Sequence, residues 1–182
     1  MNSSFARHLG CALGITLLCL GTAASARQQE AQRLRLQTPA RDISVQIAPD
    51  FVMGSDVRLV RDETAVRGRA SGRSVFVRLG EDELEGLVGS QPARLSWLEQ
   101  EGTLRLEGTL SGGPVGLELG PERLTGTAGP CTYDLEYQDE AYVGVRVCGT
   151  GGRQPVSVVL PPGLLEQVSP MEALALTLVL GM

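Results

Sequence analysis

From Ile43 to Val158, apolar and polar residues alternate in short runs, as in Ile43, Val45 and Ile47. Gly and Pro interrupt these runs about every ten residues, which is typical of strands joined by turns. Alternation with a period of two predicts half-buried strands, so the pattern indicates an all-β domain. The other runs are Val57 and Leu59; Val75, Val77 and Leu79; Leu104 and Leu106; Val115, Leu117 and Leu119; and Val156 and Val158.

An internal repeat lies within this region. Residues 66–97 align without a gap on residues 106–137, and ten of the 32 positions are identical. Roughly two or three identities would arise by chance, so the self-similarity indicates a repeated structural unit. Each unit of about 40 residues holds two smaller motifs of about 20 residues, in which an apolar residue, any residue and Gly precede a turn and an alternating run. The motif glycines are Gly68, Gly86, Gly108, Gly126 and Gly149.

Each motif predicts a strand, a tight turn and a second strand. We expect the motif glycines to mark a bulge or a close approach between backbones. Two architectures fit the repeat: an antiparallel meander of short strands that closes into a barrel or sandwich, and a β-solenoid. We favour the meander because Cys131 and Cys148 occupy non-equivalent places in successive motifs, which suits a hairpin better than stacked coils. Glycines expected at positive φ in the turns are Gly72, Gly89, Gly112 and Gly129.

Cys131 and Cys148 are predicted to form a disulfide. If residues 131–138 and 141–148 form a hairpin that turns at Asp139-Glu140, the two cysteines fall directly opposite each other. They then occupy a non-hydrogen-bonded position, where strands approach most closely. A four-residue loop with the same register is the alternative, because Asp-Glu is a poor turn dipeptide. Metal or redox roles lack a CxxC spacing or a third ligand.

The N-terminus has the features of a secretory signal peptide over residues 1–26. Arg7 supplies the positive charge, residues 11–20 are apolar, and Ala24 and Ala26 form the small-residue pattern before cleavage at Arg27. The apolar stretch is shorter than the roughly 20 residues that a membrane-spanning helix needs. We therefore expect an exported protein, periplasmic or extracellular, with no transmembrane span in the mature chain. Export also favours the disulfide, because thiols oxidise there.

Three further segments follow the signal. Residues 27–41 are rich in Gln and Arg and predict a polar leader outside the core, and residues 42–160 form the repeat-built β domain. In residues 161–182, Ser169-Pro170 and Glu172 resemble the capping box of a helix. The apolar run that follows predicts a short C-terminal helix packed on the β domain. A final strand is the alternative, because leucines alternate from Leu174 to Leu180.

Composition excludes much chemistry. All 16 cationic side chains are Arg, and the single histidine, His8, falls within the signal. A mature chain without His or Lys has no Ser-His-Asp triad, no imidazole metal site and no Schiff-base lysine. Cleavage removes Arg7 and no acid, which changes the net charge from −5 to −6. Without a basic patch, nucleic acid is not expected as a partner.

Carboxylates are the remaining groups that could catalyse a reaction near neutral pH. They form two clusters, which we expect on solvated loops: Glu81, Asp82, Glu83 and Glu85, and Asp134, Glu136, Asp139 and Glu140. The DxDxDG spacing of a calcium loop is missing. No phosphate-binding glycine motif is present either. We therefore expect no metal and no cofactor.

The sequence thus favours an exported, non-catalytic β domain that acts as a structural or protein-interaction module, with an unknown protein or cell-envelope partner. A barrel that binds a small apolar ligand in its interior is the first alternative. A cavity of about 300 Å³ or more would favour it. A carboxylate-dependent hydrolase is the second alternative and requires two carboxylates within roughly 5 to 10 Å in a cleft.

Overall fold

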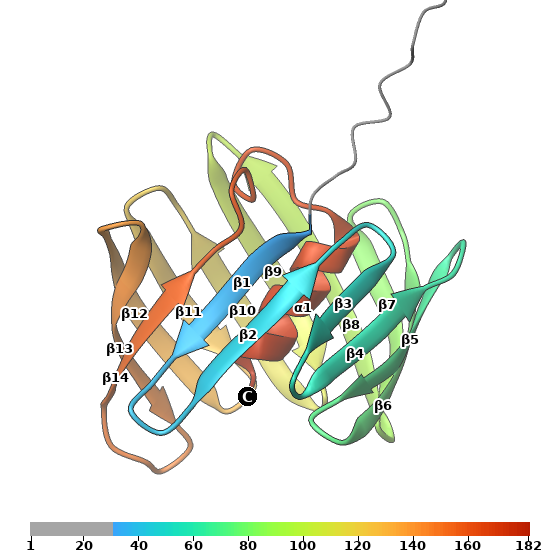
Figure 1. Cartoon of the computed structure of the whole chain (residues 1–182), viewed down its shortest axis with the longest axis horizontal. Helices are drawn as coiled ribbons and strands as arrows, with labels where there is room; N and C mark the ends of the chain where they lie inside the picture. The colour runs from blue at the N-terminus through green and yellow to red at the C-terminus, as the bar shows by residue number, and fades with distance from the viewer. Residues whose placement is uncertain (1–30) are drawn as a thin grey trace, which may run out of the picture.

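The structure, a computed structural model, describes residues 31–182 as fourteen strands and one helix (Figure 1). The predicted signal peptide and its cleavage site, with Ala24, Ala26 and Arg27, lie outside the described residues. The strands are β1 (Gln32–Gln37), β2 (Asp42–Ile47), β3 (Phe51–Gly54), β4 (Val57–Arg61), β5 (Ala65–Ala70), β6 (Arg73–Leu79), β7 (Glu83–Val88), β8 (Gln91–Gln100), β9 (Thr103–Leu110), β10 (Gly113–Leu119), β11 (Arg123–Ala128), β12 (Cys131–Gln138), β13 (Ala141–Cys148) and β14 (Gln154–Val159). The helix is α1 (Pro170–Leu180).

The strands form a closed barrel. Each strand pairs antiparallel with the next along the chain, and β1 pairs with β14 to complete the ring. The predicted all-β antiparallel meander is therefore confirmed, in its barrel form, and the sandwich and the solenoid are not adopted. Alternate residues of the strands, such as Leu34, Val45 and Leu117, point inward and are buried, whereas their neighbours are exposed and mostly polar. The period-two pattern therefore records the two faces of one continuous sheet.

The C-terminal segment is a helix, as the capping signals predict. The Ser169 hydroxyl accepts a hydrogen bond from the Glu172 amide, and the Glu172 carboxylate accepts one from the Ser169 amide. From Met171 to Leu180 every residue is buried. The helix lies inside the barrel, with β1, β2, β3 and β9 among its neighbours (Figure 1). The helix therefore packs against the β domain from within, because a helix that is apolar all round needs partners on every side.

The helix defines the two ends of the barrel. We call the end at its N-terminus the upper mouth and the other end the lower mouth, as they are oriented in Figure 1. Within residues 31–182, no helix combines the length and apolar character needed to cross a membrane.

The predicted polar leader is wrong for residues 32–37. They form β1, which closes the barrel between β2 and β14. Leu34 and Leu36 are fully buried, while Arg33 and Arg35 face the solvent. Arg and Leu alternate in this segment, which is a strand pattern. The polar composition of residues 27–41 as a whole led to the wrong prediction.

Four motif glycines allow neighbouring strands to approach closely. A Cβ atom at Gly86 would overlap the carbonyl oxygen of Phe76, and one at Gly126 would overlap that of Gly116. Gly68 and Gly108 make equivalent approaches to neighbouring backbones. The fifth motif glycine was assigned wrongly: space around Gly149 is open, and the close approach on β13 is made by Gly144 instead. The turn glycines do have positive φ, from 59° at Gly129 to 77° at Gly72 and Gly112.

The β12–β13 hairpin has the predicted register. Cys131 pairs with Cys148, Tyr137 pairs with Tyr142, and Asp139 and Glu140 form a two-residue turn with positive φ. The Gly149 amide donates to the Pro130 carbonyl, so the adjacent cysteine pair occupies a non-hydrogen-bonded position. A disulfide joins the two sulfur atoms. The presence of this disulfide is compatible with an exported protein.

Candidate functional site

The lumen of the barrel is filled rather than open. Helix α1 and the inward Leu and Val side chains form one apolar core. A ligand that needed the centre of the barrel would have to displace this helix. One cavity with room for a ligand, of about 690 Å³, lies instead at the upper mouth, beside the first turn of α1.

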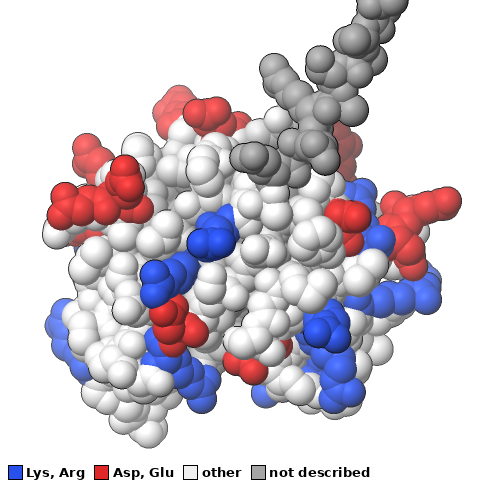
Figure 2. Space-filling view, in the orientation of Figure 1, with Lys and Arg blue, Asp and Glu red and all other residues white. Residues whose placement is uncertain are grey.

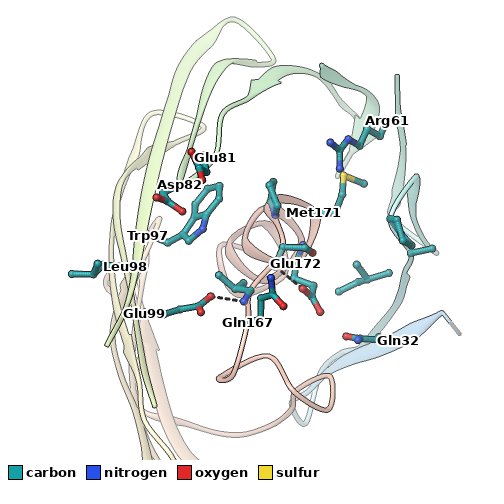
Figure 3. A pocket seen from close by; sticks show the side chains of 16 residues that line it. Gln32, Arg61, Glu81, Asp82, Trp97, Leu98, Glu99, Gln167, Met171 and Glu172 are labelled. Atoms are coloured by element: carbon teal, nitrogen blue, oxygen red, sulfur yellow. Dashed lines mark hydrogen bonds between the residues drawn. The ribbon is translucent and has the colours of Figure 1, made fainter. Parts of the chain in front are cut away.

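Apolar and acidic residues line this mouth cavity together on one wall (Figure 3). The Trp97 indole and the Met171 side chain line it, and Glu81 and Asp82 lie near the indole, with Arg61 on the opposite side. Glu99 reaches inward from β8 and accepts a hydrogen bond from the Val168 amide. Carboxylates therefore hold both the N-terminal turn of the helix and the segment that precedes it, which suits the positive end of the helix dipole.

The lower mouth has the opposite character. A cavity of about 380 Å³ there is lined by Arg41 and Arg73, and no acidic side chain lines it. The charge difference between the two ends is visible on one face in Figure 2, where acidic side chains gather along the upper edge and basic ones over the lower half.

Two polar side chains meet the helix inside the lower part of the barrel. The Tyr133 hydroxyl donates a hydrogen bond to the carbonyl oxygen of Leu180. Burial raises the pKa of the Tyr133 phenol, and the nearby Arg146 guanidinium partly opposes this rise. Arg146 pairs with Tyr133 in the β12–β13 ladder and is only 7% exposed. A cation near the C-terminal end of a helix is favoured by the helix dipole.

Sequence reasoning missed Arg146, although the predicted register contained the signal. In that register Arg146 falls on the same face of the hairpin as the two cysteines. The valines of β13, of which Val143 is 41% exposed, lie on the opposite face of the hairpin and point outward. Their partners Glu136, Asp134 and Thr132 are also on the outer face, so each of these valines lies beside a polar side chain there.

The two acidic clusters do not converge. Glu81 and Asp82 lie in a turn at the upper mouth, whereas Glu83 and Glu85 point outward from β7, and Glu83 pairs with Arg94. In the second cluster Asp134 binds Arg123 on the outer face at 2.6 Å, and Asp139-Glu140 is the hairpin turn. Strands β7 and β12 are separated by four strands in the barrel. Over residues 31–182, the acidic side chains and cysteines form no group of three or more that could hold a metal ion.

The outer surface carries a second candidate site. Phe76 and Leu87 face each other across β6 and β7, with exposed fractions of 40% and 48%. The same ladder continues to Val60 on β4, through Arg67, and to Pro92 on β8. Arg67 covers the Phe76 ring, with its guanidinium carbon 5.2 Å from the ring centre. We call Val60, Phe76, Leu87 and Pro92 the apolar row.

The equivalent ladder in the second repeat unit has no such row. There Glu107 pairs with Gly116, Gly116 pairs with Thr127, and Thr127 pairs with Thr132. These residues are 40 positions after Arg67, Phe76, Leu87 and Pro92 respectively. The same arrangement of strands is therefore built with small and polar residues, so the fold itself does not require an exposed apolar row.

Charge also differs between the two outer surfaces. We call the outer faces of β5–β8 the first wall and those of β9–β12 the second wall. Arginines dominate the first wall and carboxylates the second. The charged residues of the first wall are Arg67, Arg69, Arg78, Arg94, Glu83 and Glu85, and those of the second are Arg105, Arg123, Glu107, Glu118, Asp134 and Glu136.

Comparison of the chain with protein-family models, with curated proteins and with solved structures finds no match.

Proposed function

We propose that this protein is an exported, non-catalytic interaction module that assembles with further copies of itself, the first wall of one molecule binding the second wall of the next. The observation that carries the proposal is the apolar row, whose members Phe76, Leu87 and Pro92 are exposed on the first wall and are replaced at the equivalent positions of the second. Exposed apolar side chains that a fold does not need are typical of interaction sites.

Charge complementarity identifies the second wall as the occupant. At three equivalent positions an arginine of the first wall is replaced by an acid: Arg67 by Glu107, Arg78 by Glu118 and Arg94 by Asp134. Contact between two first walls would bring arginines together, whereas contact between unlike walls brings opposite charges together. Such complementarity favours the correct partner and speeds association.

The geometry of this contact makes the assembly heterologous. One molecule uses different surfaces to bind its two neighbours, so the contacts can continue from molecule to molecule. Such contacts generate either a closed ring or an open filament. Either product is a structural role that needs no catalytic side chain.

Sedimentation velocity of the mature protein over a range of concentrations tests the proposal. We expect association at an ionic strength of about 20 mM and weaker association at about 500 mM, because salt screens the charges between the walls. Leu87→Thr, which copies Thr127, and Arg78→Glu, which copies Glu118, should each weaken association at least tenfold.

Val143→Thr is the matched control, because Val143 is an exposed apolar residue of β13 outside both walls. It should leave association unchanged. A protein that remains monomeric at every concentration and salt condition would overturn the proposal. So would a Val143→Thr variant that weakens association as much as Leu87→Thr does.

A further inference from the structure

The mouth cavity has the size and position of a small-molecule site. Its volume of about 690 Å³ lies within the usual range of ligand pockets. It lies between the first turn of α1 and the barrel wall, so residues from the helix, from β8 and from the turn between β6 and β7 reach it (Figure 3).

The cavity has an aromatic surface. Trp97 is 7% exposed and lies beside α1, while Met171 and Ile47 add aliphatic surface. An indole attracts cations through the negative face of its ring, and it is the aromatic group that does so most strongly. An apolar body with a positive group fits this surface better than an anion does.

The cavity offers polar acceptors on two of its walls (Figure 3). Glu81 and Asp82 are exposed and both line the cavity, so their carboxylates are open to a bound cation. The amide oxygen of Gln32, another lining residue, is buried and has no hydrogen-bond partner in this part of the chain. A buried acceptor left without a donor costs free energy, which a bound donor would recover.

The surroundings of the cavity also favour a cation. Each of the six turns between strands at the upper mouth contains at least one carboxylate, and none of these turns contains an arginine. A rim of one sign of charge raises the local concentration of ligands of the opposite sign. The carboxylates of the rim are Asp50, Asp62, Glu63, Glu81, Asp82, Glu101, Glu122, Asp139 and Glu140.

We infer that the mouth cavity binds an organic cation with an apolar body, such as an alkylammonium compound, with the apolar part against Trp97 and Met171 and the ammonium group near Asp82 and Glu81. Arg61 on the opposite side of the cavity excludes a second positive group there. This inference is independent of the proposed assembly, because the cavity lies at the mouth and not on either wall.

The single tryptophan makes the test direct, because Trp97 is the only Trp in the chain. Its fluorescence is measured during titration with hexylammonium, with 1-hexanol as the uncharged analogue and hexanoate as the anionic one. We expect saturable binding of hexylammonium and at least tenfold weaker binding of hexanol and hexanoate. Binding should also weaken as salt is added.

Variants locate the site. Asp82→Asn combined with Glu81→Gln should weaken hexylammonium binding at least tenfold. Glu166→Gln, an exposed position that does not line the cavity, should change it less than twofold. Titration of the Leu87→Thr variant, in which the apolar row is interrupted, separates ligand binding from assembly and should give the wild-type affinity.

Either of two results overturns the inference. The first is equal binding of hexanol, hexanoate and hexylammonium, which would show that the cavity does not recognise charge. The second is an unchanged affinity for hexylammonium in the Asp82→Asn/Glu81→Gln variant while its circular dichroism spectrum and unfolding transition match those of the wild-type protein.

Discussion

Strands β5–β8 and β9–β12 share one plan inside the barrel and follow different plans outside it. Every pairing in the second set is displaced by 40 residues from its counterpart in the first, as with Val75–Val88 and Val115–Ala128. Both sets direct apolar residues inward and use a glycine where backbones approach. On the outside, arginines and an apolar row cover one set, and carboxylates, threonine and glycine cover the other.

The difference separates what the fold requires from what it permits. The inward positions contact the same apolar core and are similar in both sets. The outward positions contact solvent, so the sheet accepts either Phe76 and Leu87 or Gly116 and Thr127 there. Residues that differ at equivalent outward positions are therefore the ones to examine for function.

The largest effect is expected where the two sets are most alike. Gly126→Ala places a Cβ atom against the Gly116 carbonyl at a φ of 117°, so it should lower the free energy of unfolding by roughly 4 kcal/mol. Gly86→Ala creates a similar overlap without a positive φ and should cost about 2 kcal/mol. Urea unfolding measures both values.

Gly116→Ala is the control for both substitutions, because no atom lies within 4 Å of a Cβ at this position. It should change stability by less than about 0.5 kcal/mol. A cost at Gly116 equal to that at Gly126 would show that strand propensity, and not close approach, explains these glycines.

The next effect concerns a crosslink from the second set to β13, which has no equivalent in the first set. Cys131→Ala with Cys148→Ala should cost roughly 3 kcal/mol, because a bond across 17 residues no longer restricts the unfolded chain. Amide exchange followed by mass spectrometry should become faster in β12 and β13 than in β7 and β8. Two freely alkylated thiols in unreduced, exported protein would contradict the disulfide and the compartment inferred from it.

A smaller effect is expected at Tyr133, whose counterpart in the first set is Ala93. Tyr133→Phe removes the hydrogen bond to the Leu180 carbonyl and should cost about 1 to 2 kcal/mol, because a buried acceptor loses its partner. Equilibrium unfolding in urea at neutral pH measures this loss.

Tyr133 also predicts a dependence on alkaline pH. Since burial raises its pKa, the folded protein holds this proton more tightly than the unfolded chain, where the pKa is about 10. The stabilisation is complete below the unfolded pKa and is lost as pH rises through the folded pKa. Unfolding measured from pH 8 to 11 should lose stability less steeply in Tyr133→Phe than in wild type. Equal slopes would contradict the role of this phenol.

The smallest effect on stability is expected where the two sets differ most. Leu87→Thr and the reciprocal Thr127→Leu exchange outward residues and should each change the free energy of unfolding by less than about 0.5 kcal/mol. Thermal unfolding measures both. A loss above about 1 kcal/mol in Leu87→Thr would assign the apolar row a role in holding the hairpins together instead of a role in binding.

Much of the barrel could be predicted from the sequence because its rules are local. The alternation of apolar residues located β2, β4, β6, β9, β10 and β14, and the spacing of Cys131 and Cys148 predicted the register of the β12–β13 hairpin. The capping box at Ser169 located the start of α1. Each of these signals depends on residues close together in the chain.

The errors arose where the fold depends on distant partners. Leu34 and Leu36 belong to the core only because β14 lies beside them, and the polar composition of residues 27–41 obscured their alternation. The position of α1 inside the barrel depends on the number of strands that surround it. The mouth cavity and the apolar row likewise combine residues from several strands, so their members could not be grouped before the ring was known.

The enclosed helix has a consequence for how the molecule folds. The ring closes where Arg35 meets Val159, near opposite ends of the described chain, and α1 follows the last strand yet lies within the ring. A closed ring without the helix would expose the inward apolar side chains of its strands to water. A free α1 would likewise expose apolar side chains on every side. Neither state is stable, so closure and enclosure must occur as one cooperative event. We expect this long-range closure, rather than the formation of any hairpin, to set the folding rate.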